Sequence, residues 1–128
     1  MDLRNAASAY RESAFENAPP IKIVRMLYQG ALRFLEQAEQ LEPGPAGSRF
    51  AHFVTRADAI VAELRVALDK NRAPELAENL EQLYLFVEDR LRVALRERSK
   101  TPLGEARTVL VNLLQAWQQV EVGARPGA

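Results

Sequence analysis

The sequence predicts an all-α protein, an antiparallel up-down four-helix bundle with a short N-terminal helix or arm. Apolar residues recur at spacings of three and four along four segments, which is typical of helices that bury one face. No stretch alternates with period two over a useful length, so strands are not expected. Prolines and glycines separate the segments by short connections, which make neighbouring helices antiparallel. The 128 residues fit one domain.

The first segment, from residue 3 to about residue 17, carries only small and sparse apolar side chains. A helix with so little surface to bury is weakly docked, so residues 1–18 are expected to form a mobile arm or cap. An Ala-Pro-Pro sequence at 18–20 ends it, because a residue before proline is pushed out of the α region. The bundle is expected over residues 19–122, followed by a disordered tail at 123–128.

The second segment runs from Pro20 to about Glu42, and the third follows a turn built from two prolines and two glycines. Ser48 is expected to cap the third helix, which extends to about Lys70. The stripe of the second segment contains Val24, Leu27, Ala31, Phe34, Leu35, Ala38 and Leu41. The stripe of the third contains Phe50, Phe53, Val54, Ala57, Ile60, Val61, Leu64 and Leu68.

The fourth segment starts at Pro74 and breaks at Ser99-Lys100, and the fifth is expected to be capped by Thr101 with Pro102 at its first position. The fourth stripe contains Leu76, Leu80, Leu83, Tyr84, Val87, Leu91, Ala94 and Leu95. The fifth contains Leu103, Ala106, Leu110, Leu113, Leu114, Trp117 and Val120.

Composition and charge exclude several classes of function. With 17 basic and 17 acidic residues, the chain lacks the basic excess that neutralises nucleic-acid phosphates. It has no cysteine, and therefore neither disulfides nor thiolate zinc sites. No signal peptide and no membrane span is visible in the sequence, which predicts a soluble, cytoplasmic protein.

No arrangement of residues predicts catalysis. The single histidine, His52, has no glutamate three residues before it, so a di-metal bundle site is not expected. No serine lies in a Gly-x-Ser-x-Gly turn, and no glycine-rich phosphate loop is present. Acidic pairs fall on polar helix faces, where they are solvated charges. Neither enzymatic activity nor a metal or other cofactor is expected.

Some apolar residues lie outside the main stripes: Ile23, Met26 and Gly30 in the second segment, Ala59 and Val66 in the third, and Leu85, Phe86 and Val93 in the fourth. They can belong to a wide core stripe or lie under an additional helix. They can also form a groove that receives helices of another protein. Glycine inside a helix costs roughly 1 kcal/mol against alanine, so Gly30 suggests that another helix passes close to it.

The element Met26-Leu27-Tyr28-x-Gly30-Ala31, the most specific part of a match that covers residues 9 to 120, resembles the signature of the FliS family of flagellin-specific export chaperones. Two further elements support it independently: Asn79-Leu80-x-x-Leu83-Tyr84 and Ala116-Trp117. The chain departs from the family pattern at Pro19, where Ser or Thr is usual, and at Gln29, where Asp or Asn is common.

The resemblance implies a cytoplasmic, non-enzymatic chaperone that binds the C-terminal helical segment of flagellin. That segment is disordered in the monomer, folds as it wraps around the chaperone, and is kept from premature polymerisation until the complex reaches the flagellar export gate. The arm is expected to act as a lid, and Tyr10 could also contact the gate. The residues expected to bind partners are Tyr10, Ile23, Met26, Leu27, Tyr28, Gly30, Leu85 and Phe86. The alternative is a structural bundle that self-associates through the same apolar surface.

Overall fold

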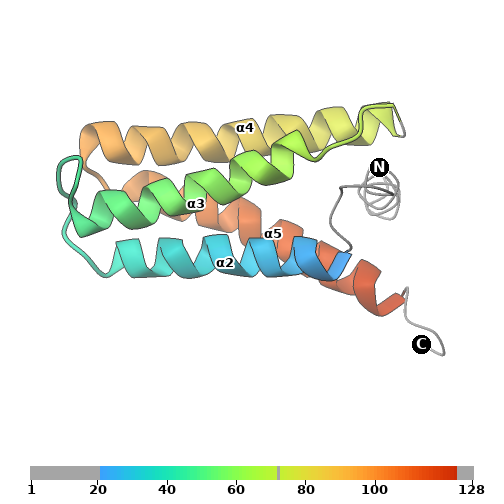
Figure 1. Ribbon diagram of the computed structural model, residues 1–128, viewed down its shortest axis with the longest axis horizontal. Helices are drawn as coiled ribbons and strands as arrows, with labels where there is room; N and C mark the ends of the chain where they lie inside the picture. Colours follow the sequence, from blue (N-terminus) through green and yellow to red (C-terminus); the bar gives the residue numbers. More distant parts are fainter. Residues whose placement is uncertain (1–20, 72, 124–128) are drawn as a thin grey trace.

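The computed structural model describes residues 21–71 and 73–123, which form four α-helices (Figure 1). They are α2 (Ile21–Glu39), α3 (Arg49–Val66), α4 (Pro74–Glu97) and α5 (Thr101–Gly123). No strand occurs within these described ranges. The predicted arm at 1–18, with Tyr10, lies outside them. Of the predicted tail, Gly123 belongs to α5 and the rest lies outside the described residues.

Successive helices run in opposite directions and pack side by side (Figure 1). Helices α2 and α4 each pack against α3 and α5, while the backbones of the diagonal pairs do not approach each other in the described residues. The four helices therefore lie at the corners of a square, and each turns its own apolar stripe towards the core between them. This arrangement confirms the predicted all-α antiparallel bundle.

Local chemistry explains where α3 begins and where its neighbours end. The Ser48 side chain accepts a hydrogen bond from the Ala51 N–H at 3.1 Å, so the predicted cap of α3 is confirmed. Just before it, Gly47 has φ of 91°, a conformation that strains any residue with a Cβ. Helix α4 ends with Arg98 in the left-handed region at φ of 49°.

Three predicted helix ends were wrong. Helix α2 ends at Glu39 and α3 ends at Val66. After Glu39, the N–H groups of Gln40 and Leu41 donate to the carbonyls three residues earlier, as in a 3₁₀ turn. Helix α5 begins at Thr101 itself rather than after it, and the Ser99 hydroxyl accepts the Thr101 N–H at 3.3 Å. A serine or threonine near a proline marks a helix start, but residue type alone does not say whether that residue precedes the helix or is its first member.

The core takes its residues from all four predicted stripes, with Leu35, Leu64, Leu91 and Leu110 among its fully enclosed side chains. Two positions on α4 were predicted wrongly. Leu83 was placed in the core stripe, yet it is 38% exposed, whereas Val93 was placed outside the stripe and is buried. The stripe is broad, and residues at its edges become buried or exposed according to how neighbouring helices tilt.

Candidate partner-binding surface

Large apolar side chains remain exposed in two separate places. Ile23 and Met26, 44% and 53% exposed, form what we call the α2 patch. Leu83, Leu85 and Phe86, each about two-fifths exposed, form what we call the α4 patch. Val66, near the end of α3, is the most exposed of the large apolar residues at 76%. A monomer gains nothing by leaving such side chains in water, so clusters of them mark candidate interaction surfaces.

The α2 patch lies beside α3. Ile23, Leu27, Gly30 and Phe34 are spaced by four, three and four residues and therefore share one side of α2. Phe34 packs against Phe53 of α3, with ring centroids 6.1 Å apart. A Cβ placed on Gly30 would lie 3.5 Å from Ile60 Cδ1 of α3, an ordinary contact distance. A helix therefore does pass close to Gly30, and in this structure it is α3 of the same chain.

The α4 patch divides between two sides of its helix. Leu85 stands four residues after Glu81 and three before Glu88, and both of these carboxylates bond to residues of α3 or the connection after it. The guanidinium of Arg90 lies over the ring of Phe86, 5.9 Å from its centroid. Arg90 also forms an ion pair with Glu105 of α5 at 3.6 Å. Leu85 therefore faces the α3 side and Phe86 the α5 side.

The two patches consequently do not line a single groove. They belong to diagonal helices whose backbones do not meet, with α3 between them on one side and α5 on the other.

Tyr28, predicted to bind a partner, is instead fully buried at the centre of the bundle. Its hydroxyl shares a hydrogen bond with the Tyr84 hydroxyl at 2.5 Å and accepts one from Trp117 Nε1 at 3.1 Å. Burial, the largest cause, and the neighbouring Tyr84 raise the pKa of Tyr28 well above its ordinary value, so its hydroxyl stays neutral. Since it has no exposed surface, Tyr28 cannot contact a partner in this conformation.

This buried cluster unites the three sequence elements that carried the resemblance. Tyr28 comes from the Met-Leu-Tyr element of α2, Tyr84 from the Leu-Tyr element of α4 and Trp117 from the Ala-Trp element of α5. Its hydrogen bonds connect α2 to α4 across the bundle, where their backbones do not meet. These motifs therefore specify the packing of the bundle, because a buried polar cluster is satisfied in one register of the helices.

Of the other predicted residues, Leu27 is half-buried against the core, Gly30 is partly covered by α3, and Tyr10 lies outside the described residues. Ile23, Met26, Leu85 and Phe86 are on the surface, as a binding role requires. Sequence reasoning missed Leu83 as a surface residue, since it follows Leu80 by three and precedes Val87 by four, a perfect core spacing.

The seam between α3 and α4 contains a group of charges that the sequence did not reveal. The buried Glu88 carboxylate accepts two hydrogen bonds from Arg65, at 2.6 and 3.2 Å, which raise the pKa of the Arg65 guanidinium. Arg92 lies 3.6 Å from the same carboxylate. Asp58, on the facing side of α3, has a buried Oδ1 without a hydrogen-bond partner, and burial raises its pKa despite the attraction of Arg92.

These groups do not resemble a catalytic or metal centre. Across residues 21–71 and 73–123, no three histidine or carboxylate side chains gather as metal ligands would. The His52 ring is exposed and stands edge-on against Phe53, with centroids 5.3 Å apart. None of the described helices is long and apolar enough to cross a membrane.

Comparisons with known proteins identify the family. A family model described as "Flagellar protein FliS" matches residues 3–124. The "Flagellar secretion chaperone FliS" of Campylobacter jejuni is 32% identical over 115 residues, which cover 90% of each chain. Proteins of the same name from Salmonella typhimurium and Bacillus subtilis are 29% and 27% identical, over 85% and 93% of this chain and 82% and 88% of theirs. The chain belongs to the FliS family of flagellar export chaperones.

Proposed function

We propose that this protein acts in the cytoplasm, binding the C-terminal helical segment of newly made flagellin without catalysing any reaction. Binding prevents premature polymerisation of flagellin, and the complex is delivered to the flagellar secretion apparatus. Membership of the family supports a chaperone role in flagellar export. The single observation that carries the finer proposal is the exposure of apolar patches on two diagonal helices.

The separation of the patches fits a partner that is unfolded before it binds. A disordered segment must offset the entropy lost when it becomes ordered, so it has to bury a large area, about 1,000–3,000 Å² in coupled folding and binding. Neither patch alone offers such an area. A segment that forms amphipathic helices over the α2 patch, crosses the bundle and continues over the α4 patch would reach both.

Pull-down with purified flagellin tests this proposal directly. Full-length flagellin should be retained, and flagellin lacking its last few tens of residues should not. Met26→Glu and Leu85→Glu each place a charge in a patch on an exposed side chain, and each should weaken retention by about tenfold or more. Gln37→Glu, also exposed and eleven residues along the same face of α2 from Met26, adds the same charge away from the patch and should have no effect.

The same experiment separates the alternative of a self-associating structural bundle. Size-exclusion chromatography with light scattering should show a one-to-one complex with a flagellin C-terminal peptide. A stable oligomer of the chain alone that ignores the peptide, or equal retention of intact and truncated flagellin, would contradict the proposal.

The role of the arm as a lid remains part of the proposal. Deletion of residues 1–17 should raise the affinity for the flagellin peptide or increase binding of a dye that reports apolar surface. If both quantities stay unchanged, the arm does not cover the binding surface.

Gly30→Ala distinguishes packing within the chain from packing against flagellin. Its new methyl group would make an ordinary contact with Ile60, so the free protein should be stabilised by about 0.5–1 kcal/mol through higher helix propensity. Weaker flagellin binding by this stabilised variant would place the partner against Gly30. Unchanged affinity would remove Gly30 from the binding surface.

A further inference from the structure

The outward side of α4 is exposed along almost its whole length. In the described parts of the chain α4 packs against α3 and α5, which leaves this side of the helix uncovered by them (Figure 1). Its exposed residues follow one another at alternating spacings of three and four, so they share one side of the helix. We call them the α4 stripe: Glu75, Glu78, Gln82, Leu85, Asp89, Arg92 and Arg96. The apolar residue Leu85 stands at the middle of the stripe, with the exposed Phe86 next to it.

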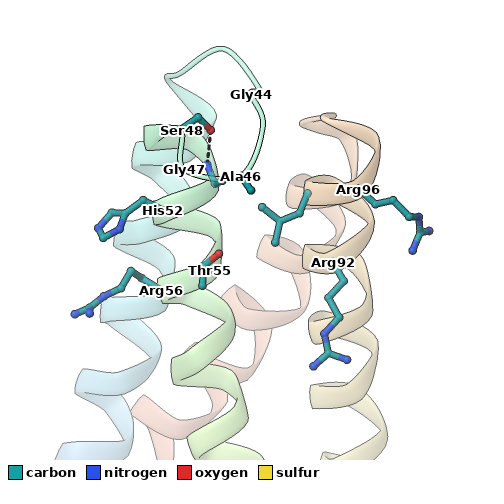
Figure 2. Close-up of a pocket in the computed structure, with 11 residues that line it drawn as sticks. Gly44, Ala46, Gly47, Ser48, His52, Thr55, Arg56, Arg92 and Arg96 are labelled. Carbon is teal, nitrogen blue, oxygen red and sulfur yellow. Dashed lines mark hydrogen bonds between the residues drawn. The ribbon is translucent and has the colours of Figure 1, made fainter.

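Charge along the α4 stripe changes sign on either side of Leu85. Two carboxylates, Glu75 and Glu78, stand near the start of the helix, and two guanidiniums, Arg92 and Arg96, stand near its end. Figure 2 shows the Arg96 side chain projecting from α4 on the side away from α3. The stripe therefore presents an acidic end, an apolar centre and a basic end to the outside of the bundle.

The helix dipole does not account for this order. The dipole favours acidic residues in the first turn and basic residues in the last, and its effect falls off within those turns. Glu78 and Arg92 lie beyond them. Helices α2, α3 and α5 have no acidic residue in their first turns, so the bundle forms three other helices without this aid. The order of charges is therefore specific to α4 and fits a role in recognition.

The α4 stripe is complementary to a reversed copy of itself. Glu78 and Arg92 each lie seven residues from Leu85, and Glu75 and Arg96 lie ten and eleven residues from it. When two α4 helices run antiparallel with Leu85 beside Leu85, each carboxylate of one copy lies opposite a guanidinium of the other. A parallel pair would instead bring like charges together. The charges thus select an antiparallel second copy, and two-fold symmetry makes each ion pair occur twice.

We propose that two copies of this chain associate through their α4 stripes in an antiparallel, two-fold symmetric dimer. Leu85 and Phe86 of both copies pack around the symmetry axis, and the ion pairs at each end fix the register. Ion pairs near solvent contribute modestly and one helix from each copy buries a small area, so the dimer is reversible. The inference goes beyond the flagellin proposal and stands without it. Only one consequence depends on that proposal: a flagellin segment that binds the α4 patch displaces the second copy.

Sedimentation velocity of the full chain over a range of concentrations tests the dimer. A reversible equilibrium between monomer and dimer should appear. Glu75→Arg and Arg96→Glu, both at exposed side chains, each place like charges opposite one another twice, and each should raise the dissociation constant of the dimer by about tenfold. The variant that carries both changes restores opposite charges and should dimerise as the original chain does.

Arg33→Glu reverses an exposed arginine on α2, the helix diagonal to α4, and is the control that should leave the dissociation constant unchanged. A chain that stays monomeric at every concentration, or a double variant that dimerises no better than the single variants, would overturn the proposal. Because these samples contain no flagellin, such a failure would leave the flagellin proposal intact.

Disulfide cross-linking tests the register. The chain contains no cysteine, so a single introduced cysteine can bond only to its counterpart in a second copy. Leu85→Cys, at the symmetry axis, should cross-link under mild oxidation. Glu75→Cys should not, because its two copies would lie about 30 Å apart along the antiparallel pair. Met26→Cys, exposed in the α2 patch, measures random collision. Cross-linking of Glu75→Cys, or equal cross-linking of Leu85→Cys and Met26→Cys, would refute this arrangement.

Discussion

The two sides of α3 pack against their neighbours by different means. Towards α2 the seam is aromatic: Phe34 and Phe53 pack at 6.1 Å, and the guanidiniums of Arg56 and Arg49 lie 5.6 and 6.0 Å from these rings. Towards α4 the seam holds ion pairs, Arg65 with Glu88 and Lys70 with Glu81, and it borders a cavity of about 600 Å³ lined by residues of α3 and α4 such as Ala51 and Leu95. The first seam is joined by apolar and aromatic contacts, whereas the second contains ion pairs and borders a cavity.

This difference indicates which seam of the bundle is insensitive to pH and salt and which seam responds to them. Dispersion and apolar burial respond little to pH and salt, so the α2–α3 seam is a constant frame. Ion pairs are sensitive to their surroundings and contribute modestly when they are near solvent. The α3–α4 seam is therefore the one whose stability a change of pH or salt can affect.

The largest expected effect breaks the aromatic seam. Phe53→Ala removes the ring that packs against Phe34 and lies under Arg49, and the free energy of unfolding should fall by about 2–3 kcal/mol, since the side chain is partly buried. Denaturant unfolding followed by circular dichroism measures this. Phe86→Ala, at a ring that is 41% exposed, is the control and should lose less than about 1 kcal/mol. Equal losses would contradict the assignment of stability to the α2–α3 seam.

A smaller loss should follow from breaking the ionic seam. Glu88→Gln removes the charge that holds Arg65, and unfolding should become easier by about 1–2 kcal/mol. The loss stays below that of Phe53→Ala because Arg65 is 29% exposed and can turn to water. Glu81→Gln, whose partner Lys70 is more exposed, should give no measurable change, and a loss as large as that of Glu88→Gln would show that burial is not the cause.

The smallest effect has the opposite sign and depends on pH. Burial raises the pKa of Asp58 above its ordinary 3.8, so the folded state disfavours the ionised carboxylate. Ionised Asp58 therefore lowers the free energy of unfolding when the pH exceeds its pKa in the folded state. This loss disappears as the pH falls below the pKa of Asp58 in the unfolded chain. Asp58→Asn should therefore stabilise the protein slightly at pH 7, with the gain shrinking towards pH 4. Unfolding titrations at both values measure this, and a gain that grows on acidification would refute it.

The sequence was a good guide to the fold because helix-forming information is local. The four stripes, the Ser48 cap and the breaks at prolines and glycines each depend on a few adjacent residues. Helices α2 and α3 end at Glu39 and Val66, where no proline or glycine follows immediately, so the sequence placed both ends too late. The hydrogen bond from the Thr101 N–H to Ser99 depends on a geometry that residue type does not determine.

The binding surface was harder to predict because periodicity does not show which neighbour covers a residue. Tyr28 and Met26 are two residues apart in one element of the sequence, yet Tyr28 is enclosed and Met26 is 53% exposed. Leu83 has core spacing yet is 38% exposed, and the helix that lies beside Gly30 is α3, whose Ile60 lies 3.5 Å from the position of a Cβ on Gly30. The cavity beside Arg92 and Arg96 is formed by segments about forty residues apart, so no local pattern indicated it.

The hydrogen-bonded centre of the bundle also provides a natural spectroscopic probe. Trp117 is the only tryptophan, and its indole is enclosed beside Tyr28, far from water. Its emission wavelength should therefore shift to the red when the chain unfolds, while ligands that settle on outer faces leave it nearly untouched. Partners that lack tryptophan can be titrated with this intrinsic signal as an internal check that the chaperone has kept its native interior.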